Sequence, residues 1–446
     1  MPVFPDSESR FPMTDTLARL RAGELAGATR LTLRADLTEF PEEIFSLADS
    51  LEILDLSGNR LTRLPADLGR LHQLRILFCS GNPFTELPEV LGTLPRLEMI
   101  GFKACQLERV GAAALPPRLR WLILTDNRIA EVPAALGERP ALQKLMLAGN
   151  RLQHLPASMA DLHQLELLRL SANRFAALPP AILELPRLTW LAYGDNPLGA
   201  ERERAVRAQA ARQQRIAWGD LQLGERLGEG ASGIIHQARW QSPTGSREVA
   251  VKLFKGSMTS DGTPESESAA SLSAGTHPWL IGALGDLAEH PEQRSGLVLE
   301  LVEPAFGNLA GPPSFTTCSR DVYPEDTRFT ASAVRSMAGG MASALAHLHG
   351  HGLVHGDFYA HNILWDGGAR CLLGDFGGAS LLPEDEIQAA RLQRFESRAF
   401  GILLEEWLAR CSEPVDPALA ALAAECQQPA LDARPLLAEV AQRLQG

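Results

Sequence analysis

The chain has 446 residues, of which 45% are hydrophobic and 22% charged, and its formal net charge at pH 7 is −12. This length accommodates two or three domains with adequate hydrophobic cores. The acidic balance argues against a general nucleic-acid binder or a binder of anionic membranes, because those partners are themselves negative.

We expect a cytoplasmic protein, because the sequence shows no recognisable targeting signal and its cysteines are scattered. The first residues lack the basic and apolar regions of a signal peptide, and no apolar run approaches the roughly 18 residues of a membrane span. The six cysteines are scattered and form no C-x-x-C pair, which fits a reduced compartment.

Residues 28–198 repeat with a period of 22 or 23 residues. The clearest copy has leucines at Leu51, Leu54 and Leu56, followed by Asn59. Leucines at this spacing would fill the inside of a coil, and coils must stack to bury their apolar faces. One polar position recurs in every copy: Asp36, Asn59, Asn82, Cys105, Asn127, Asn150, Asn173 and Asn196.

This pattern resembles the leucine-rich-repeat family, which implies an α/β solenoid, a horseshoe of about eight repeats. We expect residues 1–27 to include a capping helix from Thr14 to Leu25, with Thr14 or Asp15 as its N-cap. Residues 199–217 are expected to form a second capping helix and linker.

Apolar residues occupy outward positions in the predicted repeat strands, and the side chains concerned are Phe78, Trp121, Ile123 and Trp190. Such a patch suggests binding of a protein partner or of the downstream domain in cis. The alternative is that neighbouring side chains simply cover these residues.

The second half, residues 218–446, opens with glycines at Gly228, Gly230 and Gly233. More strand follows them, from Ile234 to Trp240, which favours a hairpin over phosphates rather than the strand–helix turn of dinucleotide folds. A further strand ends in Lys252.

Farther along, Asp357 precedes Asn362 by five residues, and Asp375 opens a Phe-Gly turn. An acid can accept a proton from an attacking hydroxyl, while Asn and a second Asp offer oxygen ligands to Mg²⁺. This combination is what phosphoryl transfer from ATP requires.

These motifs resemble the eukaryotic-type protein kinases, which implies an α+β two-lobed domain that uses ATP and Mg²⁺. The resemblance makes Asp357 the base, Asn362 and Asp375 the metal ligands, and Lys252 the phosphate-binding lysine. Glu267 would pair with Lys252, with Glu265 as its rival. The other nucleotide contacts that it implies are Leu227, Gly228, Gly230, Gly233, Ile235, Ala250, Glu300, Val302 and Leu364.

The sequence departs from the family at several positions. Gly356 stands where an Arg usually receives the activation-loop phosphate, which suggests an enzyme not switched by loop phosphorylation. Tyr359 replaces a lysine, and Glu396 replaces the usual Asp of helix F. Residues 303–330 form a longer connection than the family needs, without an assigned role.

We therefore expect an ATP- and Mg²⁺-dependent protein kinase, acting on Ser/Thr or on itself, with a repeat array that binds a protein. Two alternatives stay open. Gly356 and the short segment after Asp375 also fit a small-molecule phosphotransferase of kinase-like fold, and Tyr359 fits a pseudokinase scaffold.

Overall fold

The computed structural model describes residues 14–210, 215–230, 232–242, 244–259 and 261–445. The chain divides into two compact units between Arg187 and Leu188. This division falls at the start of the eighth repeat, and each unit is described separately. The expected boundary at residues 199–217 stays a prediction.

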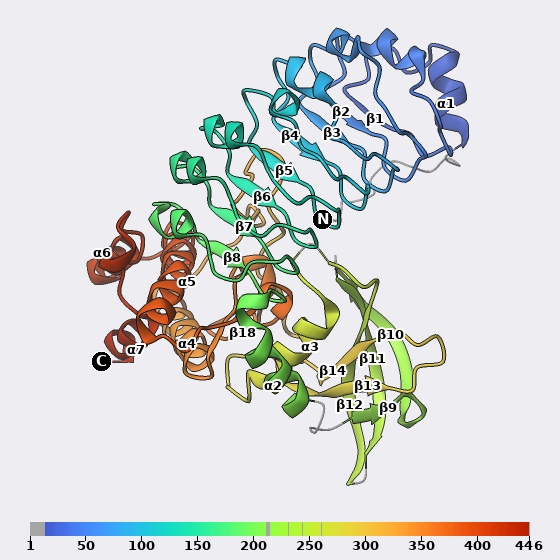
Figure 1. Cartoon of the computed structure of the whole chain (residues 1–446). Helices are drawn as coiled ribbons and strands as arrows, with labels where there is room; N and C mark the ends of the chain where they lie inside the picture. Colours follow the sequence, from blue (N-terminus) through green and yellow to red (C-terminus); the bar gives the residue numbers. More distant parts are fainter. Residues whose placement is uncertain (1–13, 211–214, 231, 243, 260, 446) are drawn as a thin grey trace. The chain divides into compact units, whose positions relative to one another are not determined.

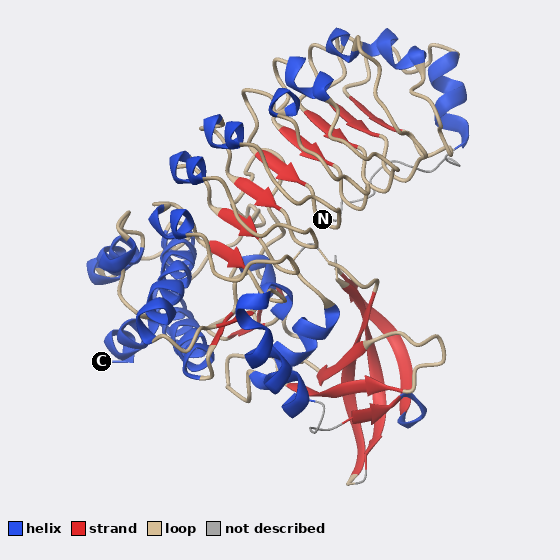
Figure 2. Ribbon diagram, viewed as in Figure 1, coloured by secondary structure: helices blue, strands red, loops and turns tan. Residues whose placement is uncertain are grey.

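The first unit is a stack of parallel three-residue strands (Figures 1 and 2). Each strand pairs with the next in register, as in Ile53 opposite Ile76. The middle residue of each strand points into the core, and Leu54 and Leu77 are fully buried. The strands are β1 (Arg30–Thr32), β2 (Ile53–Asp55), β3 (Ile76–Phe78), β4 (Met99–Gly101), β5 (Trp121–Ile123), β6 (Lys144–Met146) and β7 (Leu167–Arg169).

Short 3₁₀ helices follow the strands on the opposite side of the coils (Figure 2). Most of them begin directly after a proline, whose fixed φ suits a helix start. They are η1 (Glu42–Leu47), η2 (Leu68–Arg70), η3 (Glu89–Thr93), η4 (Ala112–Ala114), η5 (Ala134–Glu138), η6 (Ala157–Asp161) and η7 (Pro180–Glu184). The capping helix, α1 (Thr14–Arg21), is shorter than predicted. The structure describes the backbone but not the side chains of its expected N-cap residues, Thr14 and Asp15.

The recurring polar residue joins neighbouring coils. Asn82 Nδ2 donates to the carbonyls of Leu56 and Cys79, both at 2.9 Å, and its Oδ1 accepts from Leu61 N at 2.9 Å. At the atypical copy, the Cys105 thiol donates to the Cys79 carbonyl at 3.2 Å. Cysteine thus keeps one of the amide's contacts. Asp36, in the first copy, is exposed and pairs with Arg60 at 3.3 Å.

The second unit begins with β8 (Trp190–Ala192), η8 (Pro197–Gly199) and α2 (Ala200–Ala210). A six-stranded sheet follows in the order β10-β11-β12-β14-β13-β9, and only β13 and β9 pair in parallel. Helix α3 (Pro264–Ser273) packs on this sheet. The strands are β9 (Arg215–Ala217), β10 (Leu221–Glu229), β11 (Gly233–Ser242), β12 (Gly245–Phe254), β13 (Ala283–Ala288) and β14 (Gly296–Glu300), and η9 (Trp218–Asp220) precedes β10.

The remainder of this unit is mainly helical, with Phe358, Phe400 and Trp407 in its core. Its helices are α4 (Ala331–Gly350), α5 (Glu386–Leu408), α6 (Pro417–Cys426) and α7 (Leu437–Gln445), with 3₁₀ turns η10 (Ala360–Asn362), η11 (Phe376–Gly378) and η12 (Leu431–Ala433). Its short strands are β15 (Gly307–Asn308), β16 (Leu353–Val354), β17 (Ile363–Trp365), β18 (Cys371–Leu373) and β19 (Ser380–Leu381).

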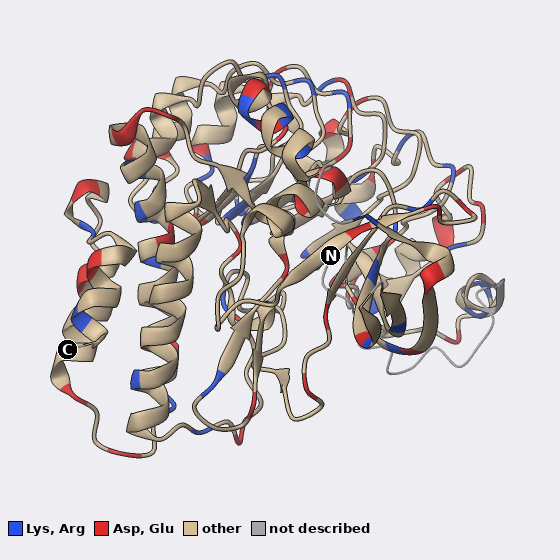
Figure 3. Cartoon of the chain, turned by 90° about the horizontal axis from the view of Figure 1, so that it is seen from below, with Lys and Arg blue, Asp and Glu red and all other residues tan. Residues whose placement is uncertain are grey.

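Figure 3 shows Lys and Arg interspersed with Asp and Glu along the chain. None of the described helices combines the length and the apolar character that a membrane crossing would need.

Candidate active site

The glycine-rich segment is a hairpin. Strands β10 and β11 pair antiparallel, with Gly228 opposite Ile235, and no helix follows the turn. A Cβ at Gly233 would lie 2.7 Å from the Leu253 carbonyl oxygen, so strand packing itself requires this glycine. A Cβ at Gly228 or Gly230 would meet nothing within 4 Å. These two glycines leave open space above the loop, whereas Ala231 lies outside the described residues.

The sheet places three of the predicted nucleotide contacts, Ile235, Ala250 and Lys252, on one face. Ile235 lies opposite Lys252, and Leu299 lies opposite Ala250. Ala250 and Lys252 are two residues apart on β12 and therefore share a face. Glu300 ends β14, its carboxylate accepts from Arg247 Nη2 at 3.0 Å, and Val302 follows it.

The remaining two predicted contacts lie on other strands of this unit. Leu227, on β10, is 47% exposed, and Leu364 lies in β17.

Lys252 is the centre of a charge cluster in which Lys252 and Glu267 are buried and the Asp375 side chain is 46% exposed. Its Nζ donates to Glu267 Oε1 and lies 3.3 Å from Asp375 Oδ1. Lys252 is 6% exposed and Glu267 is 2% exposed, while Glu265 is exposed. The structure thus places Glu267, rather than its rival, against the lysine.

Two carboxylates facing one ammonium set the titration of the cluster. Burial would lower the pKa of Lys252, but Asp375 and Glu267 outweigh it and raise that pKa. Burial raises the pKa of Glu267 to about 7 against the pull of Lys252. Its second oxygen, Oε2, has no hydrogen-bond partner among the described residues, which suits a carboxyl near its protonation point. Burial also acts to raise the pKa of Asp375, yet Lys252 holds it below its ordinary value.

Residues 355–362, the predicted catalytic stretch, join this cluster through a backbone contact next to Asp375. Asn362 Nδ2 donates to the Asp357 carbonyl at 2.8 Å and to Asp357 Oδ2 at 2.9 Å. Asn362 O accepts from Gly374 N at 3.1 Å, directly before Asp375. With its amide nitrogen engaged, Asn362 has its Oδ1 available as an oxygen ligand.

His355 lies behind the loop. It is fully buried, its Nε2 donates to the Gly374 carbonyl at 2.9 Å, and its Nδ1 accepts from Asp357 N at 3.3 Å. Both ring nitrogens are therefore used in positioning the stretch.

Gly356 occupies a position that admits no side chain. Its φ is +70°, and a Cβ there would lie 2.2 Å from the Gly378 carbonyl oxygen and 2.9 Å from that of Leu191. Its amide donates to Glu396 Oε1 at 2.7 Å, and the other Glu396 oxygen accepts from His349 Nε2 at 2.7 Å. Glu396 therefore holds the loop from helix α5.

The last repeat coil contacts the catalytic stretch and also the segment after Asp375. Trp190 Nε1 donates to the Phe358 carbonyl at 2.9 Å, and its ring stacks on Tyr359 with centroids 4.0 Å apart. Tyr193 N donates to Ser380 Oγ at 3.0 Å, and its hydroxyl donates to the Leu381 carbonyl at 3.0 Å. The sequence motifs gave no indication of these contacts of Tyr193.

The long connection of residues 303–330 braces the same loop. Asp321 accepts from His361 N at 2.9 Å and from His361 Nδ1 at 2.8 Å. Two residues later, the Tyr323 hydroxyl donates to Glu406 Oε2 on α5 at 3.0 Å. The connection thus ties the catalytic stretch to the helical core.

Glu406 provides a pH test of this brace. Burial, reinforced by the Asp321 carboxylate, raises the pKa of Glu406 to about 7 from its ordinary 4.5. Between these values the folded chain holds a proton that the unfolded chain has released, so stability falls as pH rises. Glu406→Gln keeps an acceptor for Tyr323 but cannot titrate. Urea unfolding at pH 5 and pH 8 should therefore show wild type losing on the order of 2 kcal/mol relative to the variant. Parallel pH profiles would contradict this assignment.

The predicted partner-binding residues are all buried: Phe78 is 5%, Trp121 6%, Ile123 6% and Trp190 2% exposed. Within the first unit, Lys144 Nζ lies 4.4 Å above the Trp121 ring, and Trp121 Nε1 contacts Met146 Sδ at 3.4 Å. Neighbours in the array therefore contribute to covering Trp121, whereas Trp190 stacks on Tyr359. The partner-binding stripe stays a prediction, with its cis form favoured at Trp190.

Comparison with known proteins agrees with both halves. The family model for protein tyrosine and serine/threonine kinases matches residues 221–400, and two leucine-rich-repeat models match residues 49–92 and 117–175. The chain is 29% identical over 183 residues to a Dictyostelium discoideum protein named "Probable serine/threonine-protein kinase", a match that covers 41% of this chain.

A solved leucine-rich-repeat protein of Leptospira interrogans is 29% identical, with a TM-score of 0.32, and the match covers 39% of this chain. The aligned part spans 10% of the Dictyostelium protein and 50% of the Leptospira chain. The predicted fold class, a repeat solenoid followed by a kinase-like domain, is confirmed. The chain thus carries leucine-rich repeats at residues 49–92 and 117–175, followed at residues 221–400 by a domain that matches the protein tyrosine and serine/threonine kinase family model.

Proposed function

We propose that this chain transfers the γ-phosphate of ATP, with Mg²⁺, to a serine or threonine hydroxyl of a protein or of itself. The observation that carries the proposal is the meeting of Lys252, Glu267 and Asp375 in one cluster, joined to Asn362 and Asp357. A set of this kind serves positioning and electrostatic stabilisation, which dominate phosphoryl transfer.

The residues fit the nucleotide and the metal. The open space at Gly228 and Gly230 would let phosphates approach the loop backbone. Asn362 Oδ1 and the Asp375 carboxylate are hard oxygen donors of the kind that Mg²⁺ prefers. When bound, Mg²⁺ would neutralise phosphate charge.

Each residue then has a defined task. Lys252, held by Glu267, binds phosphate oxygens. Asp357, fixed by Asn362, orients the acceptor hydroxyl and accepts its proton. Asn362 and Asp375 hold the metal, and His355 and Glu396 keep the loop in place behind them.

The nature of the acceptor follows from the relatives and the repeats. The Dictyostelium relative is named a serine/threonine-protein kinase, which supports a hydroxyl acceptor in a protein. Leucine-rich repeats suggest protein interaction, so the array would select the substrate or another protein partner.

The test is transfer of labelled γ-phosphate by the full chain with Mg²⁺ and a generic protein substrate, against a reaction containing a chelator. We expect metal-dependent labelling of the substrate or of the chain. Labelling of aminoglycoside or choline acceptors alone would instead indicate a small-molecule phosphotransferase.

A nucleotide-binding scaffold is the second candidate, favoured by one observation. Tyr359 takes the place of the expected lysine, and its ring is stacked on Trp190. ATP binding by calorimetry without labelling of any acceptor would reject the kinase proposal and support the scaffold.

A further inference from the structure

Helix α3 carries Glu267 but has little intrinsic stability. It has ten residues, Pro264–Ser273, and four of them are serines. Isolated helices shorter than about 12 residues are marginal in water, and serine is a weak helix former. The tertiary contacts of α3 therefore decide where Glu267 lies relative to Lys252.

One of those contacts comes from the last repeat coil. Asp195 Oδ2 accepts hydrogen bonds from Thr263 Oγ1 and from Ser266 Oγ, both at 2.6 Å. Thr263 is the N-cap of α3, because its Oγ1 accepts from Ser266 N at 3.3 Å. Hydroxyl bonds to a carboxylate are short and strong, and a negative charge is favourable at a helix N-terminus.

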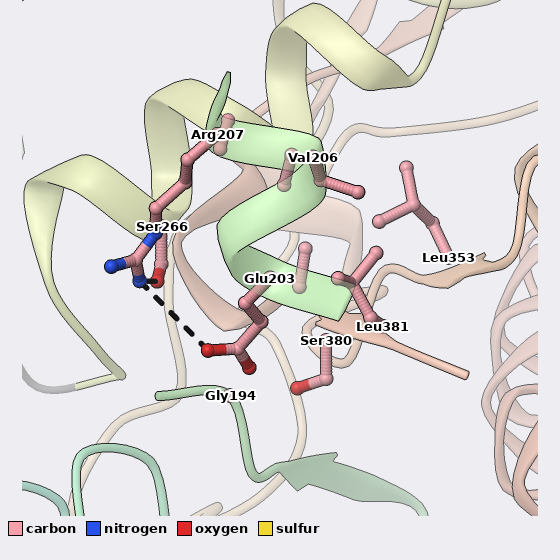
Figure 4. A pocket seen from close by; sticks show the side chains of 11 residues that line it. Gly194, Glu203, Val206, Arg207, Ser266, Leu353, Ser380 and Leu381 are labelled. Atoms are coloured by element: carbon pink, nitrogen blue, oxygen red, sulfur yellow. Dashed lines mark hydrogen bonds and ion pairs between the residues drawn. The ribbon is translucent and has the colours of Figure 1, made fainter. Parts of the chain in front are cut away.

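Asp195 is itself fixed in place. Its other oxygen pairs with Arg207 of α2, and its amide donates to Glu203 Oε1 at 2.9 Å. Arg207 also donates to Ser266 Oγ at 2.7 Å, so α2 and Asp195 hold the same serine. Figure 4 shows Glu203 and Arg207 on α2 beside Ser266, with Ser380 and Leu381 lining the same pocket.

The same coil contacts two other segments of the site, through Trp190 at Phe358 and through Tyr193 at Ser380. Three residues of this coil, Trp190, Tyr193 and Asp195, thus contact the catalytic stretch, the segment after Asp375 and the start of α3. We propose that Asp195 is a positioning residue for phosphoryl transfer: it fixes α3 where Glu267 reaches Lys252. The catalytic part of this proposal rests on the proposed kinase function.

The repeat pattern supplies a matched control. Asp126 precedes Asn127 as Asp195 precedes Asn196, and both aspartates have φ of 58°. Asp126 is exposed and belongs to the first unit. Alanine is acceptable at this coil position, because Ala104 and Ala172 occupy it at φ of 55° and 53°. Asp195→Ala should therefore fold.

The experiment compares the full-length wild type with Asp195→Ala, Asp195→Asn and Asp126→Ala. Hydrogen exchange of the amides of residues 264–273 reports α3 without requiring activity, and steady-state kinetics report transfer. We expect Asp195→Ala to speed exchange in α3 and to lower kcat, each by about tenfold, as loss of a charged hydrogen bond would. Asp195→Asn should be intermediate, and Asp126→Ala should match the wild type.

A mutant cycle separates positioning from general destabilisation. If Asp195 acts through Ser266, the Ser266→Ala substitution should lower kcat less in the Asp195→Ala variant than in the wild type. Additive losses, or unchanged α3 exchange in Asp195→Ala, would overturn the proposal. If the wild type transfers no phosphate, the kinase function is rejected, and α3 exchange still decides whether Asp195 positions the helix.

Discussion

The Asp357→Ala variant should transfer the γ-phosphate about a hundred- to ten-thousandfold more slowly than the wild type, the range typical of removing a general base. Its affinity for the nucleotide should change little, because Lys252, Glu267 and Asp375 remain together. Initial rates with labelled ATP and calorimetric titration with the nucleotide measure the two quantities separately.

Asp357→Asn is the control for structure. Asp357 Oδ2 accepts from Asn362 Nδ2 at 2.9 Å, and the new amide keeps an oxygen for that bond but cannot take a proton. If proton transfer is the role of Asp357, this variant should be as slow as Asp357→Ala. Recovery of most of the wild-type rate would show that the carboxylate only holds Asn362.

Replacing Gly356 by arginine, the residue usual in the kinase family, is expected to abolish phosphate transfer. Any side chain at Gly356 requires a left-handed backbone, which costs about 1–2 kcal/mol, and forces Cβ against two carbonyl oxygens. Since both oxygens belong to backbone, overpacking should add about 1–3 kcal/mol. Gly356→Ala should lower the unfolding temperature and the transfer rate, and Gly356→Arg should lower them further.

Gly367 separates the two causes. Its φ is +78°, but a Cβ there would meet nothing within 4 Å. Gly367→Ala therefore measures the backbone cost alone, by thermal unfolding of the full chain. Equal destabilisation by the two alanine variants would mean that Gly378 and Leu191 can move aside, and an active, stable Gly356→Arg would contradict the steric explanation.

Periodic and closely spaced features were predictable from sequence. The recurring asparagine follows from the 22- or 23-residue period, because the coils that carry it repeat the same bonds. Lys252 and Glu267 were proposed because strand and helix follow each other at the expected spacing, and their side chains meet. Gly356 was visible as a departure, although its reason, a carbonyl on each side, was not.

Contacts between distant segments could not be read from the sequence. Trp190 stacks on Tyr359 and donates to the carbonyl of Phe358, although 168 residues separate Trp190 from Phe358. No local pattern encodes such a pairing: the sequence placed Trp190 in a patch that binds a protein partner or the downstream domain in cis, and it marked Tyr359 only as the replacement of a lysine. Asp321 had no assigned role for the same reason, because its partner His361 lies 40 residues away.

The eighth coil has a consequence for how this protein can change over generations. Coils interact mainly with their neighbours, so duplication or loss of a coil within the first unit alters the reach of the array alone. The eighth coil is different, because Trp190, Tyr193 and Asp195 each contact kinase residues. Descendants of this gene should therefore vary in repeat number while inheriting the final coil together with the kinase, as one unit of descent.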